Sequence, residues 1–205
     1  MSQTRPPLPI LQGERCLLRA LVPEDAPALV VHANDPAVAR NLFDAFPQPY
    51  TREAAQAWAG HEASSGAFGC VWAIVVDGGL VGCIGLRQEQ GWLRCNAEIG
   101  YWIGQAFWRR GIASDAVRQV VDWAFAAVPE ITRIHAPIFA SNEGSQAVVR
   151  RCGFVREAIL PQSAIKDGRV IDRVVWAIYR TQVARRDADI GATLAATAAD
   201  AMERA

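Results

Sequence analysis

The sequence has little lysine and no excess of either charge. Of its 205 residues, 21 are Lys or Arg and 21 are Asp or Glu, so the formal net charge is zero, and Lys166 is the single lysine. A general polyanion binder usually carries a basic excess, so this balance argues against non-specific binding to nucleic acids. It leaves open a local basic patch.

Paired cysteines and clustered histidines are also missing. The five cysteines are widely spaced without a CxxC pair, and the three histidines are scattered along the chain. These patterns argue against a zinc knuckle, a thioredoxin-type redox site and a histidine metal cage. We therefore expect no metal cofactor, and free thiols as in a reducing cytoplasm.

Long apolar runs are absent. No run approaches the roughly 20 residues of a membrane span. The first residues, MSQTRPPLPI, lack the apolar core of a signal peptide. We expect a soluble, cytoplasmic protein that does not work in a membrane.

Common catalytic and nucleotide-binding signatures do not occur either. The sequence contains no GxxxxGK[ST], no GxGxxG after a strand, no HExxH and no GxSxG. These absences argue against an ordinary nucleotide P-loop, a dinucleotide site, a zinc protease and a serine hydrolase.

The chain does contain enough apolar residues for one sizeable core. Hydrophobic residues make up 51% of it and charged residues 20%, which suits a globular domain rather than disorder. We divide the chain into a flexible N-terminal arm at residues 1–12, a domain at 13–180, and an Ala-rich tail at 181–205 that is helical or disordered.

Within the domain the residue pattern predicts a sheet flanked by helices. Predicted strands cover residues 13–20, 71–76, 80–86, 95–103, 131–139, 154–165 and 170–179. Predicted helices begin at Pro23 and Thr51 and cover 111–128 and 142–152. Since hairpins outnumber crossovers, we expect an α/β (α+β) domain with a mixed sheet.

The most informative stretch runs from Glu98 to Ala116. A strand leads into a short loop with Arg109, Arg110 and Gly111, and the loop leads into a long helix. The first amides of a helix have no intrahelical partner and carry the positive end of its dipole. With two guanidinium groups beside them, they predict a phosphate or pyrophosphate cradle. The alternative is a solvated basic turn.

This loop resembles the acyl-CoA pyrophosphate loop of the GCN5-related N-acetyltransferase (GNAT) family. Gly111 and Ala113 fill the last two fixed places of that loop, whereas Trp108 departs from the usual Gln or Arg at the first. The tryptophan is similar to the ribosomal-protein N-terminal (Rim-type) branch. So are a second block at residues 142–154 and the hairpin at 166–172. The resemblance covers residues 12–180 in the right order.

The resemblance implies a GNAT-type mixed, mostly antiparallel sheet of about seven strands flanked by helices. It implies a splay between strands four and five, at residues 98–103 and 134–139, into which acetyl-CoA enters. Backbone near Trp102 and Ile103 would pair with the pantetheine arm. The implied cofactor-binding residues are Tyr101, Trp102, Ile103, Trp108, Arg109, Arg110, Gly111, Ile112, Ala113, Ser114, Asn142, Ser145 and Arg150.

Acetyl transfer needs a base for the amine, donors for the oxyanion and an acid for the thiolate. The resemblance implies Glu98 as the base, with a strand glutamate that faces solvent or pairs with an arginine as the alternative. Many family members carry a tyrosine seven residues after the position of Asn142, but this chain has Val149 there. Ser145 is the implied substitute, although a serine at a helix start often only caps it.

The acceptor amine is expected on the other side of the gap. Its candidate wall residues, each of which could instead belong to the core, are Phe43, Phe46, Tyr50, Trp58 and Trp72. Asp172 either holds an ammonium group or braces the last hairpin. Cys152 is expected to pack in the core rather than act as a nucleophile.

We therefore expect an acetyl-CoA-dependent N-acetyltransferase in which an amine, either a protein N-terminal α-amine or a small-molecule amine, attacks directly in a ternary complex. A non-catalytic acyl-CoA-binding or sensor module is the first alternative, because of Val149. An interaction scaffold that uses the Ala-rich tail is the second. A homodimer stays open.

Overall fold

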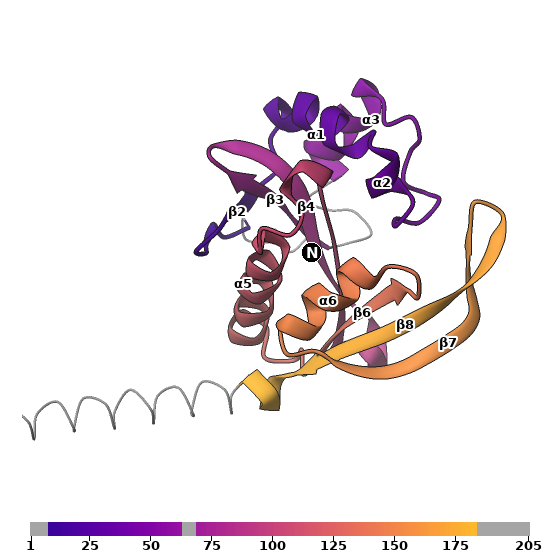
Figure 1. The fold of residues 1–205 in the computed structure, drawn as a ribbon. Helices are drawn as coiled ribbons and strands as arrows, with labels where there is room; N and C mark the ends of the chain where they lie inside the picture. Colours follow the sequence, from indigo (N-terminus) through magenta and orange to yellow (C-terminus); the bar gives the residue numbers. More distant parts are fainter. Residues whose placement is uncertain (1–7, 63–68, 184–205) are drawn as a thin grey trace, which may run out of the picture.

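The computed structural model describes residues 8–62 and 69–183 (Figure 1). One eight-stranded sheet runs through this part of the chain in the order β1-β2-β3-β4-β5-β6-β8-β7. Its strands are β1 (Leu11–Gln12), β2 (Leu17–Ala20), β3 (Cys70–Val76), β4 (Gly79–Gln88), β5 (Asn96–Ile103), β6 (Arg133–Phe139), β7 (Val155–Lys166) and β8 (Arg169–Tyr179). Among the described strands only β5 and β6 pair in parallel, so the predicted mixed, mostly antiparallel sheet is confirmed.

The helices begin and end close to the predicted positions. They are α1 (Ala26–Ala33), α2 (Pro36–Ala39), α3 (Arg52–Ala57), α5 (Ile112–Ala127) and α6 (Glu143–Arg151). The Thr51 hydroxyl accepts a hydrogen bond from the Ala54 amide at 3.1 Å, so it caps α3 as predicted. After α6, Gly153 has a φ of +87°, the left-handed conformation that ends many helices.

Residues 8–12 differ from the flexible arm predicted for residues 1–12. Leu11 pairs with Leu18 in β1 and β2, and Leu8 and Leu11 pack against the core. The indole Nε1 of Trp72 donates to the Pro9 carbonyl at 3.0 Å. Residues 1–7 and 184–205 lie outside the described residues, so the arm and tail predictions stay predictions there.

Both faces of the central sheet are buried, each under different helices. Side chains alternate along a strand, so the neighbours Val71 and Trp72 point to opposite faces. Trp72, Ile84 and Ile99 join the core cluster that contains α5. Val71 and Cys83 join a second cluster under α1 and α3. Figure 1 shows α1, α2 and α3 grouped together, apart from α5 and α6.

The two parallel strands separate after a short paired region. β5 and β6 pair at three positions, the last of which joins Glu98 to His135. Beyond it β5 stays with β4 as far as Ile103, while β6 stays with β8 as far as Phe139. The predicted splay between these strands is therefore confirmed.

Candidate active site

A cavity of about 1590 Å³ occupies the gap between β5 and β6 and extends to both faces of the sheet. Glu98, Gly100 and Trp102 line it from the face covered by α1 and α3. Ile99 and Tyr101 line it from the opposite face, where α5 and α6 lie. The cavity thus passes through the sheet. We call its part on the face of α5 and α6 the α5–α6 half, and its part on the face of α1, α2 and α3 the α2–α3 half.

The α5–α6 half begins at a tight loop before α5. Arg109 has a φ of +61° and Gly111 a φ of +79°. The first backbone amide of α5 that donates a helical hydrogen bond is that of Asp115, to the Gly111 carbonyl at 3.0 Å. No hydrogen bond joins the amides of Ile112, Ala113 or Ser114 to another described residue. These amides form the positive end of a 16-residue helix.

Glycine at position 111 is needed for its conformation and for the space around it. A Cβ there would lie 3.0 Å from the Arg15 Nε. Arg15 Nη1 donates to the Arg110 carbonyl at 3.4 Å, which sets a third guanidinium beside the loop. Asp115, 6% exposed, accepts hydrogen bonds from the amides of Arg15 and Cys16 and so ties α5 to the turn before β2. Sequence reasoning missed both Arg15 and Asp115, because they are far apart in the chain.

The two consecutive arginines have different surroundings. Arg109 lines the cavity, whereas Arg110 is not among its lining residues and lies over the Phe107 ring, 5.4 Å from its centroid. Trp108 Nε1 donates to the Ile103 carbonyl at 2.8 Å. That bond fixes the loop to the end of β5.

Arg150 does not line the cavity, whereas Arg151 does. The cavity-facing residues of α6 include Gly144, Val148 and Arg151, which recur at helical spacing, and Arg150 points elsewhere. Helical spacing counted from residue 144 would have found Arg151. Because Arg150 is not among the residues that line the cavity, the structure does not bring it to the site.

One buried hydroxyl in this half lacks a partner. Ser114 is 3% exposed and lines the cavity, and its Oγ has no hydrogen-bond partner among the residues described. Its carbonyl accepts the thiol of buried Cys152 at 3.3 Å. Cys152 therefore packs as predicted. Val149, at the position of the family tyrosine, is fully buried.

The start of α6 is tied to β5 across the gap. Asn142 caps the helix, with Oδ1 accepting from Ser145 N at 3.0 Å and Nδ2 donating to Ser145 Oγ at 3.1 Å. The Tyr101 hydroxyl donates to the Ser145 carbonyl at 3.1 Å, and burial raises the pKa of that tyrosine. Ser145 is thus part of the cap and also lines the cavity.

The backbone of β5 presents an edge to the gap. Asn96 O accepts from Glu89 N, and Gly104 N donates to Val81 O. Because backbone N–H and C=O groups alternate in direction along a strand, those of the even-numbered residues of β5 face β4. The peptide groups of Tyr101 and Ile103 therefore face the gap. The backbone near Trp102 was also expected to pair with the pantetheine arm. The peptide group of Trp102 instead faces β4, and only its side chain lines the α2–α3 half.

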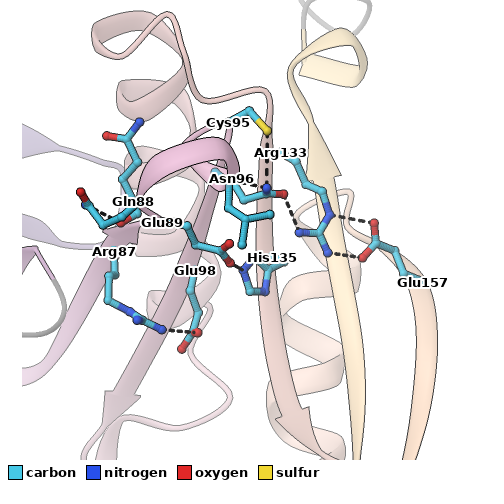
Figure 2. A network of polar contacts seen from close by, with 11 residues as sticks. Arg87, Gln88, Glu89, Cys95, Asn96, Glu98, Arg133, His135 and Glu157 are labelled. Atoms are coloured by element: carbon cyan, nitrogen blue, oxygen red, sulfur yellow. Dashed lines mark hydrogen bonds and ion pairs between the residues drawn. The ribbon is translucent and has the colours of Figure 1, made fainter.

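Glu98 lies where the two strands begin to separate. It lines the cavity, and its Oε2 accepts from Arg87 Nη2 at 2.8 Å. Figure 2 shows it beside His135, whose Nε2 lies 2.9 Å from Glu89 Oε1. The alternative reading of this glutamate is therefore confirmed, because the carboxylate pairs with an arginine. The carboxylate also faces the cavity, and its role as the base stays a prediction.

Aromatic side chains wall the α2–α3 half. Phe43, Phe46, Tyr50 and Trp58 line it as predicted. Phe46 stacks on Tyr50 with ring centroids 5.0 Å apart, and it meets Trp102 edge-on at 5.9 Å. This wall gives the half an apolar surface next to Glu98.

Two predicted acceptor residues do not line the cavity. Trp72 is 0% exposed and packs against Trp123 on the α5 face, while its neighbour Val71 lines the cavity. Asp172 is exposed, and its Oδ1 accepts from Gln162 N at 2.8 Å. It braces the β7–β8 hairpin, which was the stated alternative.

Cys83 is the cysteine that lines the cavity. Burial raises the pKa of its thiol to about 12, so the thiol stays neutral and is a poor nucleophile. Over residues 8–62 and 69–183, no three His, Cys, Asp or Glu side chains gather as metal ligands. None of the helices in that part of the chain is long and apolar enough to cross a bilayer.

Comparison with known proteins gives a consistent family. The family model for the acetyltransferase (GNAT) domain matches residues 15–155. The curated but uncharacterized N-acetyltransferase YoaA of Bacillus subtilis (strain 168) is 27% identical over 84% of this chain and 97% of its own length. Further curated Bacillus N-acetyltransferases align at 30–35% identity over 53–58% of their lengths.

Solved structures of similar fold cover most of the chain. Mycobacterium smegmatis RimJ in complex with CoA-disulfide has a TM-score of 0.76 and 22% identity, over 85% of this chain and 88% of its own. RimL, a ribosomal L7/L12 α-N-protein acetyltransferase in complex with coenzyme A, has a TM-score of 0.72 and 21% identity, over 83% and 98%. These similarities establish the fold.

Proposed function

The chain belongs to the GNAT acetyltransferase family and is an acetyl-CoA-dependent acyltransferase, and we propose that its acceptor is a primary amine that attacks the thioester directly in a ternary complex. One observation carries this proposal: a single cavity joins the free amides of α5 to the Glu98 carboxylate through the splayed sheet. Both substrates can then meet without a covalent enzyme intermediate.

The residues of the α5–α6 half fit acetyl-CoA. The amides of Ile112, Ala113 and Ser114, the orphaned Ser114 hydroxyl and the cavity-lining Arg109 suit a pyrophosphate. Arg151 supplies a further positive charge. The RimJ and RimL structures, solved with CoA-disulfide and with coenzyme A, support the same ligand.

We assign the pantetheine arm and the thioester to the open edge of β5. The peptide groups of Tyr101 and Ile103 face the gap, and the Ile103 carbonyl accepts from Trp108 Nε1. The Tyr101 group would pair with the arm like an added strand. An N–H on this edge, for which we choose Ile103, would stabilise the oxyanion that forms when the amine attacks.

We assign Glu98 as the base. Its carboxylate takes the amine proton, directly or through a water molecule, as the amine nitrogen bonds to the thioester carbon. The carbonyl re-forms, the C–S bond breaks, and the thiolate leaves. The position of Glu98 in the cavity, at the last paired step of β5 before the strands separate, supports this role.

We assign Ser145 as the group that passes a proton to the thiolate. Its hydroxyl donates to the leaving sulfur and takes a replacement proton from solvent water, and Glu98 releases the amine proton to solvent. Because Asn142 Nδ2 donates to the Ser145 oxygen, the serine hydroxyl keeps its own proton for another acceptor. Replacing Ser145 with Ala should slow turnover by about tenfold while acetyl-CoA still binds. Ser141→Ala, at an exposed cavity-lining serine one residue before the cap, is the matched control.

The acceptor is either a protein N-terminal α-amine or a small amine. The named activity of RimL, an α-N-protein acetyltransferase, favours the first. A thiol-release assay over peptides and small amines, with calorimetry of acetyl-CoA binding, tests the function. If acetyl-CoA binds but no amine releases thiol, the chain is a non-catalytic acyl-CoA-binding module, the alternative that buried Val149 favours.

A further inference from the structure

The α2–α3 half of the cavity carries more positive than negative charge. Its charged lining residues are Arg40, Glu98 and Arg173, and Glu98 is bonded to Arg87. Neither Arg40 nor Arg173 has an ion-pair partner in the described part of the chain. Such a lining repels a polycation and attracts an anionic group.

A β-bulge orients Arg173 toward the cavity. The register of β7 and β8 shifts after Leu160, and the extra residues are held by Gln162 N donating to Asp172 Oδ1 at 2.8 Å. In the bulge, Ser163 Oγ donates to Leu160 O at 2.7 Å and accepts from Arg173 Nε at 3.2 Å. Bulges of this kind re-aim side chains. The terminal nitrogens of this guanidinium make no hydrogen bond to any described residue, so the fork is open to a carboxylate or phosphate.

The sheet register sets the spacing between this fork and the base. Glu98 pairs with His135, and Arg173 pairs with Phe139, so all four residues point to the same face. His135 and Phe139 are four residues apart on β6, so the Glu98–His135 pair and the Arg173–Phe139 pair are about 13 Å apart. An extended peptide advances roughly 3.3–3.6 Å per residue, so an anionic side chain at its second to fourth residue reaches Arg173.

The aromatic wall lines the same half of the cavity as Glu98 and Arg173. Phe46 and Trp102 meet edge-on there, and Tyr50 supports Phe46. Asp44 joins the segment between α2 and α3 to the hairpin tip through Lys166 Nζ, at 3.0 Å, and the Asp167 amide. The chain's single lysine is therefore already paired, and it brings the aromatic wall up to the Arg173 hairpin.

We propose that the acceptor is an amine with an apolar group next to it and an anionic group beyond, held by Arg173 and Arg40 while the amine lies at Glu98. The inference rests on the proposed function and narrows its substrate class to acidic peptide N-termini or amines of equivalent shape. Polyamines and lysine-rich segments are excluded by the same charges.

Peptides that differ at one position test this proposal. Amidated peptides of sequence Ser-Phe-X-Gly, with Asp, Asn or Lys at X, are compared by kcat/KM in the thiol-release assay. The Asp peptide should exceed the Asn peptide by about tenfold, and the Lys peptide should be the poorest. Equal rates for the three peptides, or a preference for Lys, would overturn the inference and leave acetyl transfer to amines intact.

Arginine variants locate the origin of the preference. Arg173→Gln should reduce the Asp-to-Asn ratio to about one, and Arg173→Glu should favour the Lys peptide. Arg40→Gln tests the second guanidinium if the strand variants fold poorly. Arg169→Gln, an exposed arginine of the same hairpin outside the cavity, should keep the ratio. An unchanged ratio in both Arg173→Gln and Arg40→Gln contradicts the assignment. Silence with every amine overturns the proposed function as well.

Discussion

The two halves of the cavity are built in opposite ways. The α5–α6 half depends on main-chain groups from one continuous stretch, Ile103 to Ser114, with Gly111 at its turn. The α2–α3 half depends on side chains that come from α2, α3 and the segment between them, and from β3, β4, β5 and β8. A site made of backbone amides tolerates many side chains but needs a defined loop, whereas a site made of side chains can change its ligand by single substitutions. The first half therefore suits a common cofactor, and the second suits a particular acceptor.

The largest expected effect separates a core tryptophan from the aromatic wall. Trp72→Ala should lower the free energy of unfolding by about 3–5 kcal/mol, because the side chain is fully buried against Trp123. Phe46→Ala should instead raise KM for an apolar acceptor at a smaller cost in stability. Urea unfolding and steady-state kinetics measure both. A stable Trp72→Ala variant with a raised KM for the acceptor would contradict this and indicate that Trp72 contacts the acceptor.

The next effect concerns the point where the halves meet. Glu98→Gln should lower kcat/KM about 100-fold and leave acetyl-CoA affinity unchanged, because an amide cannot accept the amine proton. Glu89→Gln is the matched control, since that carboxylate belongs to the same network but binds His135 (Figure 2). If the two variants lose activity equally, the network is structural and Glu98 is not the base.

A smaller effect tests the main-chain half. Gly111→Ala should weaken acetyl-CoA binding about tenfold, since a left-handed residue with a side chain is strained by about 1–3 kcal/mol and its Cβ would press on Arg15. Gly78→Ala carries the same strain, with a φ of +81°, in a hairpin turn with open space around it. Calorimetry should show weaker binding in the first variant alone. Equal affinities would mean that the loop does not hold the cofactor.

The smallest expected effect is on stability, at Glu157, near the end of the sheet where β5 and β6 are still paired. Hydrogen bonds from Arg133 and Tyr179 hold the pKa of the Glu157 carboxyl below its ordinary value of 4.5. Because this folded-state pKa is depressed, the stabilisation is present above that ordinary value and is lost as pH falls through the depressed one. Unfolding free energies should show wild type exceeding Glu157→Gln by less than about 1 kcal/mol at neutral pH. The difference should vanish in acid; a difference that grows there contradicts the sign.

Local chemistry explains which elements could be predicted. Turns and helix caps depend on residues that are close together in the sequence, so a local pattern is enough to predict them. Examples are the turn at Asp77 and Gly78, the cap at Thr51 and the end of α6 at Gly153. The loop at Gly111 and the unpaired amides after it could be predicted for the same reason, because a helix start supplies its own amides.

Errors occurred where the face of an element mattered. The run Val71–Val76 is apolar at every position, so alternation could not tell that Val71 faces the cavity and Trp72 the core. On α6 a shift of one residue exchanged Arg150 for Arg151. The β5 register decided that Ile103, and not Trp102, presents its peptide to the gap.

The sequence by itself determined the family, the order of strands and helices along the chain, and the loop with unpaired amides before α5, because these depend on patterns between neighbours in the chain. Only the tertiary structure decided which side chains meet in the α2–α3 half of the cavity. Glu98 and Arg173 are 75 residues apart in sequence and share one face only because β5 pairs with β6 and β6 with β8. Neither pair is joined by a tight turn that would fix its register, so the register depends on contacts between residues far apart in the sequence.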